Sequence, residues 1–152
     1  MFDLYKFIST GLYIGYSKIA PGTLGSITVI ILLHIISNIF HFDIDVFKYI
    51  FFVVVLLLGS YSVKKIIGNT IADPSYIVID EWAGQLLALL FVPVTLSASI
   101  GGFFLFRLFD ITKLWPINKA EKLHGYKGVM ADDLVAGLIA GIILAGITAF
   151  FS

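Results

Sequence analysis

The chain has 152 residues, of which 59% are hydrophobic and only 13% are charged, and ten Lys and Arg balance ten Asp and Glu. Soluble domains carry about a quarter charged residues, so this composition and a mean hydropathy of +1.02 predict an integral membrane protein. The balanced charge excludes a strongly basic nucleic-acid surface. The absence of cysteine excludes a cysteine nucleophile, thiolate metal sites and disulfides. The length predicts a single domain over residues 1–152.

The first half of the chain predicts two membrane spans. Residues 1–17 lack the unbroken apolar core of a signal peptide, and we expect an interfacial helix there. Residues 17–26 contain Pro and Gly and are predicted to form an ordered loop or a broken helix start. Apolar runs at 24–40 and 49–63 each predict a membrane-crossing helix, joined by a polar connection at 41–48.

The second half predicts three more membrane-embedded helices. Residues 77–92 and 96–115 form either two full spans or a shallower hairpin, and in both cases the start of the first helix returns beside the end of the second. A polar loop at 116–130 leads to a last span at 134–151. The fold class is therefore all-α: a polytopic helical membrane protein with about five membrane-embedded helices and an N-terminal interfacial helix. The last span also has small residues at the spacing of close helix packing, Gly137, Gly141 and Ala145.

Half of the acidic residues lie inside or against these apolar runs: Asp80, Glu81, Asp110, Asp132 and Asp133. An ionised acid near hydrocarbon is costly unless a cation, a metal or water neutralises it, so such residues indicate a functional site. Three separate segments supply them, which suggests one shared site. Carboxylate and water are ligands that suit magnesium or manganese, so all five are candidate metal ligands.

Structural roles are the alternative for the acids. Asp80 and Glu81 could simply favour the positive end of a helix dipole, although three apolar residues precede them. Asp132 or Asp133 could cap the last span, but a cap needs one acid only.

The candidate phosphate-binding residues are basic or lie in a Gly-rich segment. Arg107 is the only arginine in the chain, and its planar fork suits phosphate recognition. Arg107, Asp110 and Lys113 are spaced by three, so an intrahelical ion-pair ladder is the structural alternative. His124 could be a general acid, a phosphate donor or a loop histidine. Thr23 and the backbone amides around it could cradle a phosphate.

The basic residues also predict the topology. Lys18, Lys64 with Lys65, and the cluster over 107–127 fall on one side, while 41–48 falls on the other. By the positive-inside rule the first side is cytoplasmic. All five carboxylates then lie at the cytoplasmic face.

Four sequence blocks carry a resemblance to a known family. They are APGTLGS at 20–26, DPSYIVIDEWAGQ at 73–85, FRLFDITKLWPI at 106–117 and HGYKGVMADDLVAG at 124–137. In this order they resemble phosphatidylglycerophosphatase A, a multi-pass lipid phosphatase of the bacterial inner membrane.

The resemblance implies magnesium-dependent hydrolysis of phosphatidylglycerophosphate to phosphatidylglycerol and inorganic phosphate, with manganese as a substitute ion. It implies the catalytic residues Asp80, Glu81, Asp110 and Asp133. It implies the metal ligands Asp80, Glu81, Asp110, Asp132 and Asp133. The predicted substrate-binding residues are Lys18, Thr23, Arg107, Lys113 and His124. The nucleophile is either a metal-activated water or a carboxylate, Asp80 or Asp110.

Two rival functions remain open. The first is another membrane enzyme of phospholipid phosphates, such as a CDP-alcohol phosphotransferase, although its D-G-x-x-A-R pattern is absent. The second is a cation-coupled transporter, which predicts acids near the bilayer midplane, whereas here they gather at one face. The sequence leaves open the number of metal ions, the acyl-chain preference and the oligomeric state, a homo-oligomer included.

Overall fold

The computed structural model describes residues 3–40, 43–68 and 74–151, and this part of the chain contains helices and no strand. In chain order the helices are α1 (Leu4–Ser9), η1 (Ile14–Tyr16), α2 (Pro21–Ile39), α3 (Ile44–Ile67), α4 (Ile79–Leu89), α5 (Leu96–Thr112), α6 (Ile117–Ala120) and α7 (Tyr126–Phe151). The predicted all-α fold class is confirmed.

Three of the described helices are long and apolar enough to cross a membrane: α2, α3 and α7, with 19, 24 and 26 residues. Helix α4 has 11 residues and α5 has 17. At 1.5 Å per residue, α4 is about 16 Å long, roughly half the thickness of the hydrocarbon core. Its length therefore favours the shallower hairpin over two full spans for this pair.

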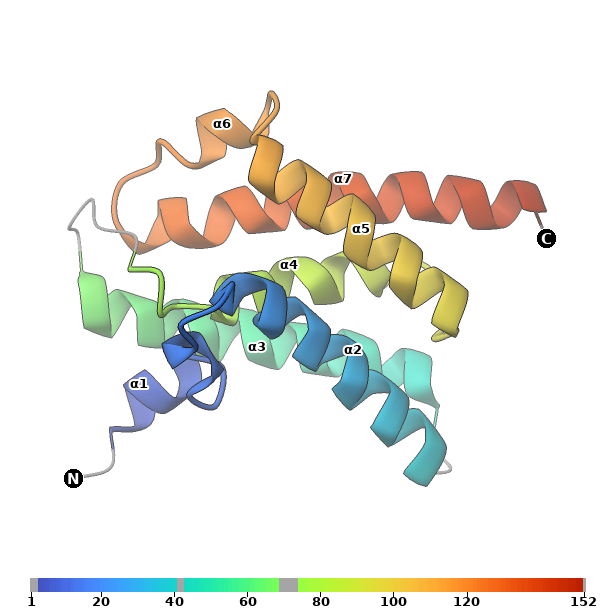
Figure 1. The fold of residues 1–152 in the computed structure, drawn as a ribbon, viewed down its shortest axis with the longest axis horizontal. Helices are drawn as coiled ribbons and strands as arrows, with labels where there is room; N and C mark the ends of the chain where they lie inside the picture. The colour runs from blue at the N-terminus through green and yellow to red at the C-terminus, as the bar shows by residue number, and fades with distance from the viewer. Residues whose placement is uncertain (1–2, 41–42, 69–73, 152) are drawn as a thin grey trace.

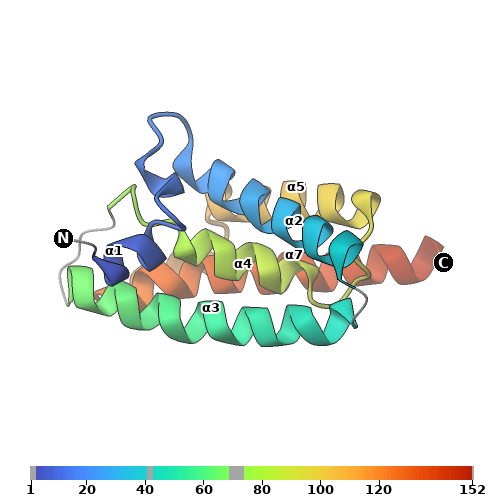
Figure 2. The same cartoon turned by 90° about the horizontal axis from the view of Figure 1, so that it is seen from below.

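Helix α4 lies in the middle of the bundle, packed against α7, α3, α2 and α5 (Figures 1 and 2). Nine of its 11 residues are buried, with only Glu81 and Leu87 partly exposed. Neighbouring helices therefore cover almost the whole surface of α4, its polar residues Asp80 and Gln85 included.

Helix α2 begins at Pro21, inside the segment that the sequence predicted as an ordered loop or a broken helix start. The irregular backbone ends at Ala20, whose φ of 42° is left-handed. Proline suits the first position of a helix because its fixed φ is helical and its missing N–H would have no helical partner there. Of the two predicted alternatives, the helix start is therefore confirmed from Pro21 onward and the loop is wrong there.

Helix α6 covers Ile117–Ala120 and helix α7 begins at Tyr126, so nine of the 15 residues in the predicted loop 116–130 are helical and the loop prediction is wrong there. The sequence treated its glycines as loop residues. Gly125, with φ of 64°, does end the loop, but Gly128 is helical. A Cβ added at Gly128 would lie 2.3 Å from the carbonyl oxygen of Leu123. Glycine is needed there because the incoming chain passes directly over the first turn of the helix.

Helices α4 and α7 touch through their backbones. A Cβ added at Gly137 would lie 2.2 Å from the carbonyl oxygen of Gly84, and one at Gly141 would lie 3.0 Å from that of Leu87. The predicted close packing along the small residues of α7 is confirmed at these two glycines.

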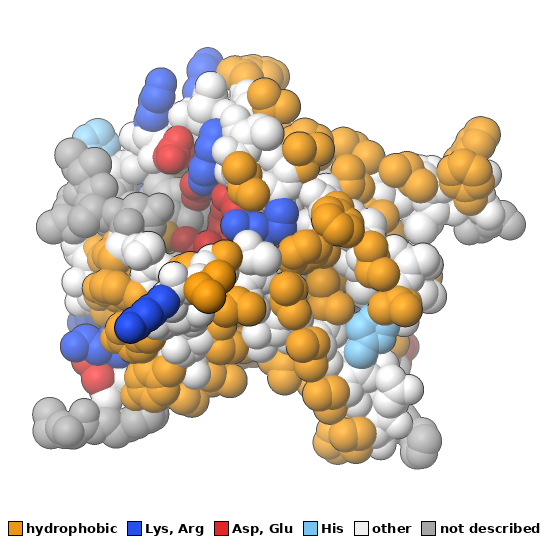
Figure 3. All heavy atoms as spheres, in the orientation of Figure 1, with side chains coloured by type: hydrophobic (Ala, Val, Ile, Leu, Met, Phe, Trp, Pro, Cys, Tyr) orange, Lys and Arg blue, Asp and Glu red, His pale blue; other side chains and the backbone are white. Residues whose placement is uncertain are grey.

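The starts of α2, α4 and α7, the ends of α3 and α5, and helix α6 all lie at one end of the bundle (Figure 1). The end of α2, the start of α3 and the C-terminus lie at the other. Most charged side chains visible in Figure 3 gather at the first end, and hydrophobic side chains cover the rest of this face. The predicted separation of the basic residues from the 41–48 connection agrees with this arrangement, with residues 41 and 42 outside the described chain.

Candidate active site

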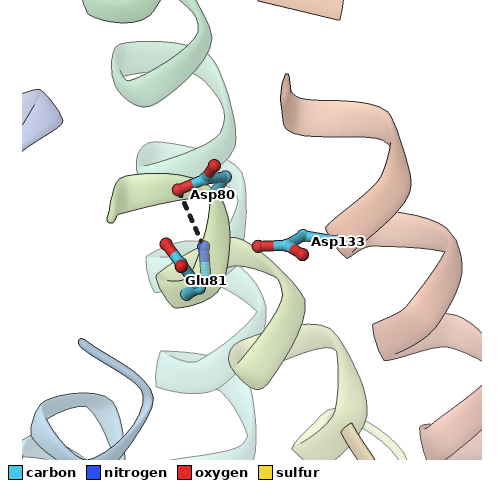
Figure 4. A group of neighbouring side chains, drawn as sticks. All are labelled: Asp80, Glu81 and Asp133. Atoms are coloured by element: carbon cyan, nitrogen blue, oxygen red, sulfur yellow. Dashed lines mark hydrogen bonds between the residues drawn. The ribbon is translucent and has the colours of Figure 1, made fainter. Parts of the chain in front are cut away.

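Three carboxylates converge at the centre of the charged end (Figure 4). Asp80 and Glu81 come from the first turn of α4, and Asp133 comes from α7. Each offers an oxygen, and these oxygens all lie within 4.8 Å of one another. Asp80 is 6% exposed and Asp133 is 3% exposed, so this is an interior cluster. The sequence predicted that separate segments would share a site, and the structure brings these three together.

The glycine contact between α4 and α7 explains the convergence. Asp80 lies four residues before Gly84, and Asp133 lies four residues before Gly137. The two helices run in the same direction (Figure 1), so one turn back from the contact each helix presents an acid at the same level. Backbone contact at the glycines therefore brings these acids close together.

A cavity of about 390 Å³ adjoins two of the acids, Asp80 and Glu81. Its lining comes from α2, α4, α5 and the segment before α4: Ala20, Pro21, Gly22, Thr23, Ser75, Ile77, Asp80, Glu81, Arg107 and Ile111. A Cβ added at Gly22 would lie 2.1 Å from Oε1 of Glu81 and 3.3 Å from Nη1 of Arg107. Glycine at position 22 therefore keeps open the space in front of these two groups.

Arg107, Asp110 and Lys113 form the ion-pair ladder that the spacing of three predicted as an alternative. Nη1 of Arg107 lies 2.5 Å from Oδ2 of Asp110, and Nζ of Lys113 lies 3.2 Å from Oδ1. Lys113 also donates a hydrogen bond to Oδ2 of Asp132 and so joins α5 to α7. Asp110 and Asp132 are thus held by cations.

Lys113 is half-buried, and burial alone would disfavour its charged form. The hydrogen bond to Asp132 and the negative charges of Asp132 and Asp110 outweigh this, and they raise the pKa of Lys113 above its ordinary value. Lys113 therefore carries a full positive charge at neutral pH and fixes the position of both carboxylates.

Several polar atoms at this site have no hydrogen-bond partner among the described residues. They include Oε2 of Glu81, Nε of Arg107 and Oδ1 of Asp132. Neither Glu81 nor Asp133 forms a salt bridge within residues 3–40, 43–68 and 74–151. A buried polar atom without a partner is costly, so the unsatisfied groups point to a ligand that belongs here.

The structural alternatives for the acids fare differently. Asp80 and Glu81 do lie in the first turn of α4, where the helix dipole favours them. Asp132 and Asp133 do not cap α7, because that helix begins at Tyr126.

The five predicted substrate-binding residues lie in different places in the structure. Thr23 and Arg107 line the cavity, and Lys113 pairs with acids. Lys18 and His124 are exposed and lie outside the cavity lining, so their roles remain predictions. Sequence reasoning missed Gly22, for which the only signal was a glycine directly after a helix-starting proline.

The fold and the site define the class of protein. It is a helical membrane protein in which a buried carboxylate cluster and the arginine of the chain adjoin one cavity. A family model described as phosphatidylglycerophosphatase A matches residues 7–148, and the chain belongs to that family. The resemblance carried by the four sequence blocks is therefore confirmed.

Three relatives match over most of their length. A protein of Bacteroides thetaiotaomicron, whose name assigns it provisionally to the phosphatidylinositol-3-phosphatases, is 34% identical over 91% of this chain and 89% of its own. Phosphatidylglycerophosphatase A of Escherichia coli K12 is 29% identical over 95% and 83%, and that of Haemophilus influenzae is 34% identical over 92% and 86%. No solved structure matches the chain. The apolar helices and these relatives indicate a membrane-associated bacterial phosphatase.

Proposed function

We propose that the protein hydrolyses phosphatidylglycerophosphate to phosphatidylglycerol and inorganic phosphate, with the terminal phosphate bound in the cavity between α2, α4 and α5. One observation carries the proposal: a carboxylate cluster and a partly unsatisfied arginine adjoin the same cavity at the charged end of the bundle. The names of the Escherichia coli and Haemophilus influenzae relatives supply the substrate.

The residues at the site fit a divalent cation. Three carboxylates whose oxygens lie within 4.8 Å of one another repel when they are ionised, unless positive charge lies between them. Oε2 of Glu81 also lacks a partner within the described chain. Oxygen ligands are what Mg²⁺ and Mn²⁺ prefer. Asp80, Glu81 and Asp133 would hold the ion. When bound, it would supply positive charge to the phosphate oxygens and help an attacking water to lose its proton.

The ion pairs among Arg107, Asp110, Lys113 and Asp132 indicate a different role for Asp110 and Asp132. Asp110 pairs with Arg107 and Lys113, and Asp132 pairs with Lys113. Asp110 also contacts Asp133, and Oδ1 of Asp132 has no partner within the described residues. Because both acids already hold a cation, we assign them to orienting Arg107 and Lys113 and not to the ion. Fixing the guanidinium in advance stabilises charge on the transferring phosphoryl group without reorganisation during the reaction. The proposal thus narrows the five predicted metal ligands to three.

The geometry also bears on the nucleophile. Asp110 is engaged by two cations and does not line the cavity, whereas Asp80 does. If a carboxylate attacks phosphorus, Asp80 is the candidate, and water is the alternative. Rapid quenching of a single turnover with radioactive lipid phosphate separates the two. Attack by Asp80 expels the lipid alcohol and leaves the phosphoryl group transiently on the protein as an acyl phosphate, whereas attack by water releases it directly as inorganic phosphate.

We place the cavity on the cytoplasmic side of the bacterial inner membrane, because Lys64, Lys65 and the basic residues of the 107–127 segment share its end of the bundle. Single cysteines test this cleanly in a chain without native cysteine. Exposed Ile19 and Lys122 should be labelled from the cytoplasm after replacement by Cys, and Phe40 from the other side. Labelling of positions 19 and 122 from opposite sides would contradict the topology.

The Bacteroides relative favours a second candidate substrate, phosphatidylinositol 3-phosphate, which is also a lipid phosphomonoester. Purified protein in detergent should be offered both lipids, with phosphate release as the measurement. We expect the phosphatidylglycerophosphate to have the higher kcat/KM. A higher kcat/KM for phosphatidylinositol 3-phosphate would make that lipid the substrate of the same site. No phosphate release from either lipid would contradict the proposed function.

Metal dependence is tested on the same protein. Chelation should abolish phosphate release, and added Mg²⁺ or Mn²⁺ should restore it. Calorimetric titration of metal-free protein with Mn²⁺ gives a readout that does not depend on turnover, and binding should be lost in Glu81→Gln. Full activity after exhaustive chelation would contradict the metal site.

A further inference from the structure

A groove of about 470 Å³ runs along the surface between α2 and α5. Its lining is mostly apolar: Thr23, Phe103, Phe104, Arg107, Leu108 and Ile111. Three of these residues, Thr23, Arg107 and Ile111, also line the cavity beside the carboxylates. The groove is therefore continuous with the cavity.

We propose that this groove holds the glycerol-proximal part of one acyl chain of the lipid substrate, an inference that rests on the proposed function. A phosphate bound between Arg107 and the carboxylates is tethered through a short polar head group to acyl chains, which must leave the polar cavity along an apolar surface. The groove provides such a surface at the border of the cavity. Its volume is within the range of small-molecule sites, about 300–1,000 Å³.

Arg107 forms the boundary between the two spaces. Its side chain is 15% exposed and lines both, with one guanidinium nitrogen paired to Asp110 and the guanidinium 5.9 Å from the ring of Phe106. Arginine suits this position because its aliphatic stem lies along apolar surface while its charged end stays polar. The lipid would change from polar head group to hydrocarbon at this residue.

A second groove shows that apolar character alone does not select the acyl-chain site. It lies between α5 and α7, measures about 560 Å³ and is lined by residues that include Ser97, Leu144, Ile147 and Thr148. It shares only Phe104 with the first groove and no residue with the cavity. Continuity with the carboxylate site is therefore the property that distinguishes the α2–α5 groove.

The first test compares matched substitutions in the two grooves. Leu108→Trp fills the α2–α5 groove and Ile147→Trp fills the other; the native side chains are 55% and 46% exposed, so neither substitution disturbs a core. The measurement is the ratio of kcat/KM for butyryl phosphatidylglycerophosphate to that for its deacylated form, which has the same head group and no acyl chain. Leu108→Trp should lower this ratio about tenfold, the effect of roughly two methylene groups losing their contacts. Ile147→Trp should leave it at the wild-type value. An unchanged ratio in Leu108→Trp, or an equal fall in both variants, would overturn the inference.

The second test does not depend on turnover. A phosphatidylglycerophosphate with a photoreactive diazirine near the ester of one acyl chain is irradiated with the full-length protein, and labelled peptides are mapped. We expect labels on α2 and on the 103–111 segment of α5, which short-chain lipid should displace. Labels confined to the second groove, or spread evenly over α3 and α7, would overturn the inference. Absence of phosphate release with correct labelling would count against the proposed function instead.

Discussion

The two ends of α4 both bury charge, but they do so in opposite ways. At the C-terminal end, Lys48 of α3 is 1% exposed. Its ammonium donates to the carbonyl oxygens of Leu89 at 3.2 Å and Val92 at 2.6 Å and pairs with Asp45 at 2.8 Å. Each of its three protons has an acceptor. At the N-terminal end, the buried carboxylates of the cluster adjoin a cavity, and Oε2 of Glu81 has no partner within the described residues.

The difference separates a structural charge from a functional one. The helix dipole favours both, a cation at the C-terminus and acids at the N-terminus, so local electrostatics alone does not distinguish them. Satisfaction does. Lys48 satisfies the last carbonyl groups of α4, whereas Oε2 of Glu81 has no partner within the described residues and is available to a ligand.

The largest effect on activity is expected from substitutions of the three clustered acids at the N-terminal end of α4. Asp80→Asn, Glu81→Gln and Asp133→Asn each keep the size of the side chain and remove one charge. Turnover should fall by at least about a hundredfold, because losing a preorganised electrostatic contact to the transition state typically costs about 3 kcal/mol. The melting temperature without metal should stay the same or rise, since the substitution relieves repulsion between carboxylates. Phosphate release and thermal unfolding in detergent provide the measurements.

The control is Asp43→Asn at the opposite end of the bundle. Asp43 caps α3 by accepting hydrogen bonds from the backbone N–H groups of Asp45 and Val46, and Asn caps a helix about as well. We expect near wild-type activity. Amide variants that lose activity only in proportion to stability would show that the acids are scaffold.

The next effect tests whether the glycine contact sets the distance within the cluster. Gly137→Ala places a methyl group 2.2 Å from the carbonyl oxygen of Gly84, so α4 and α7 must separate. We expect a loss of about 1–3 kcal/mol of stability from overpacking. Affinity for Mn²⁺ should fall as well, because Asp133 moves away from Asp80 and Glu81. Calorimetric titration and thermal unfolding measure the two effects.

Gly146→Ala is the matched control on the same helix. A Cβ there meets nothing within 4 Å, so alanine should stabilise α7 by up to about 1 kcal/mol through helix propensity. Metal affinity should not change. Equal behaviour of the two alanine variants would show that close backbone contact does not set the site geometry.

The smallest effect on catalysis is expected at the lysine end. Lys48→Met keeps the aliphatic stem and leaves the carbonyl oxygens of Leu89 and Val92 without their donor, which should cost about 1–3 kcal/mol of stability. The pair with Asp45 adds little, because Asp45 is largely exposed. Turnover per folded molecule should stay at the wild-type level. Lys6→Met, at an exposed lysine, should change neither quantity. A turnover defect in Lys48→Met without loss of stability would show that the two ends are not separate in function.

The sequence alone could predict the acids of the site because a carboxylate in an apolar run has few structural explanations. It could also predict that Asp80 and Glu81 lie near Arg107, since an antiparallel return places the start of one helix beside the end of the next. The proximity to Arg107 is confirmed by the cavity that these residues share, while the functional role of the acids stays a prediction.

The division of the five acids into three that cluster and two that pair with cations could not be predicted in this way. It depends on the contact that Lys113, at the end of α5, makes with Asp132 of α7. The spacing of residues along one helix predicts contacts within that helix and not contacts between helices. The burial of Lys48 was missed for the same reason. It lies in a polar stretch of sequence, and only the packing of α3 against the end of α4 covers it.

The contact of Gly84 with Gly137 has a consequence for the protein in different lipid surroundings. Because no side chain lies between the two backbones, no rotamer can change there to absorb a shift in lateral pressure or bilayer thickness. The three carboxylates one turn away then keep their separation when the lipid changes. We therefore expect the dissociation constant for Mn²⁺ to be nearly the same in detergent micelles and in vesicles of short or long acyl chains, even where KM for the lipid substrate differs widely.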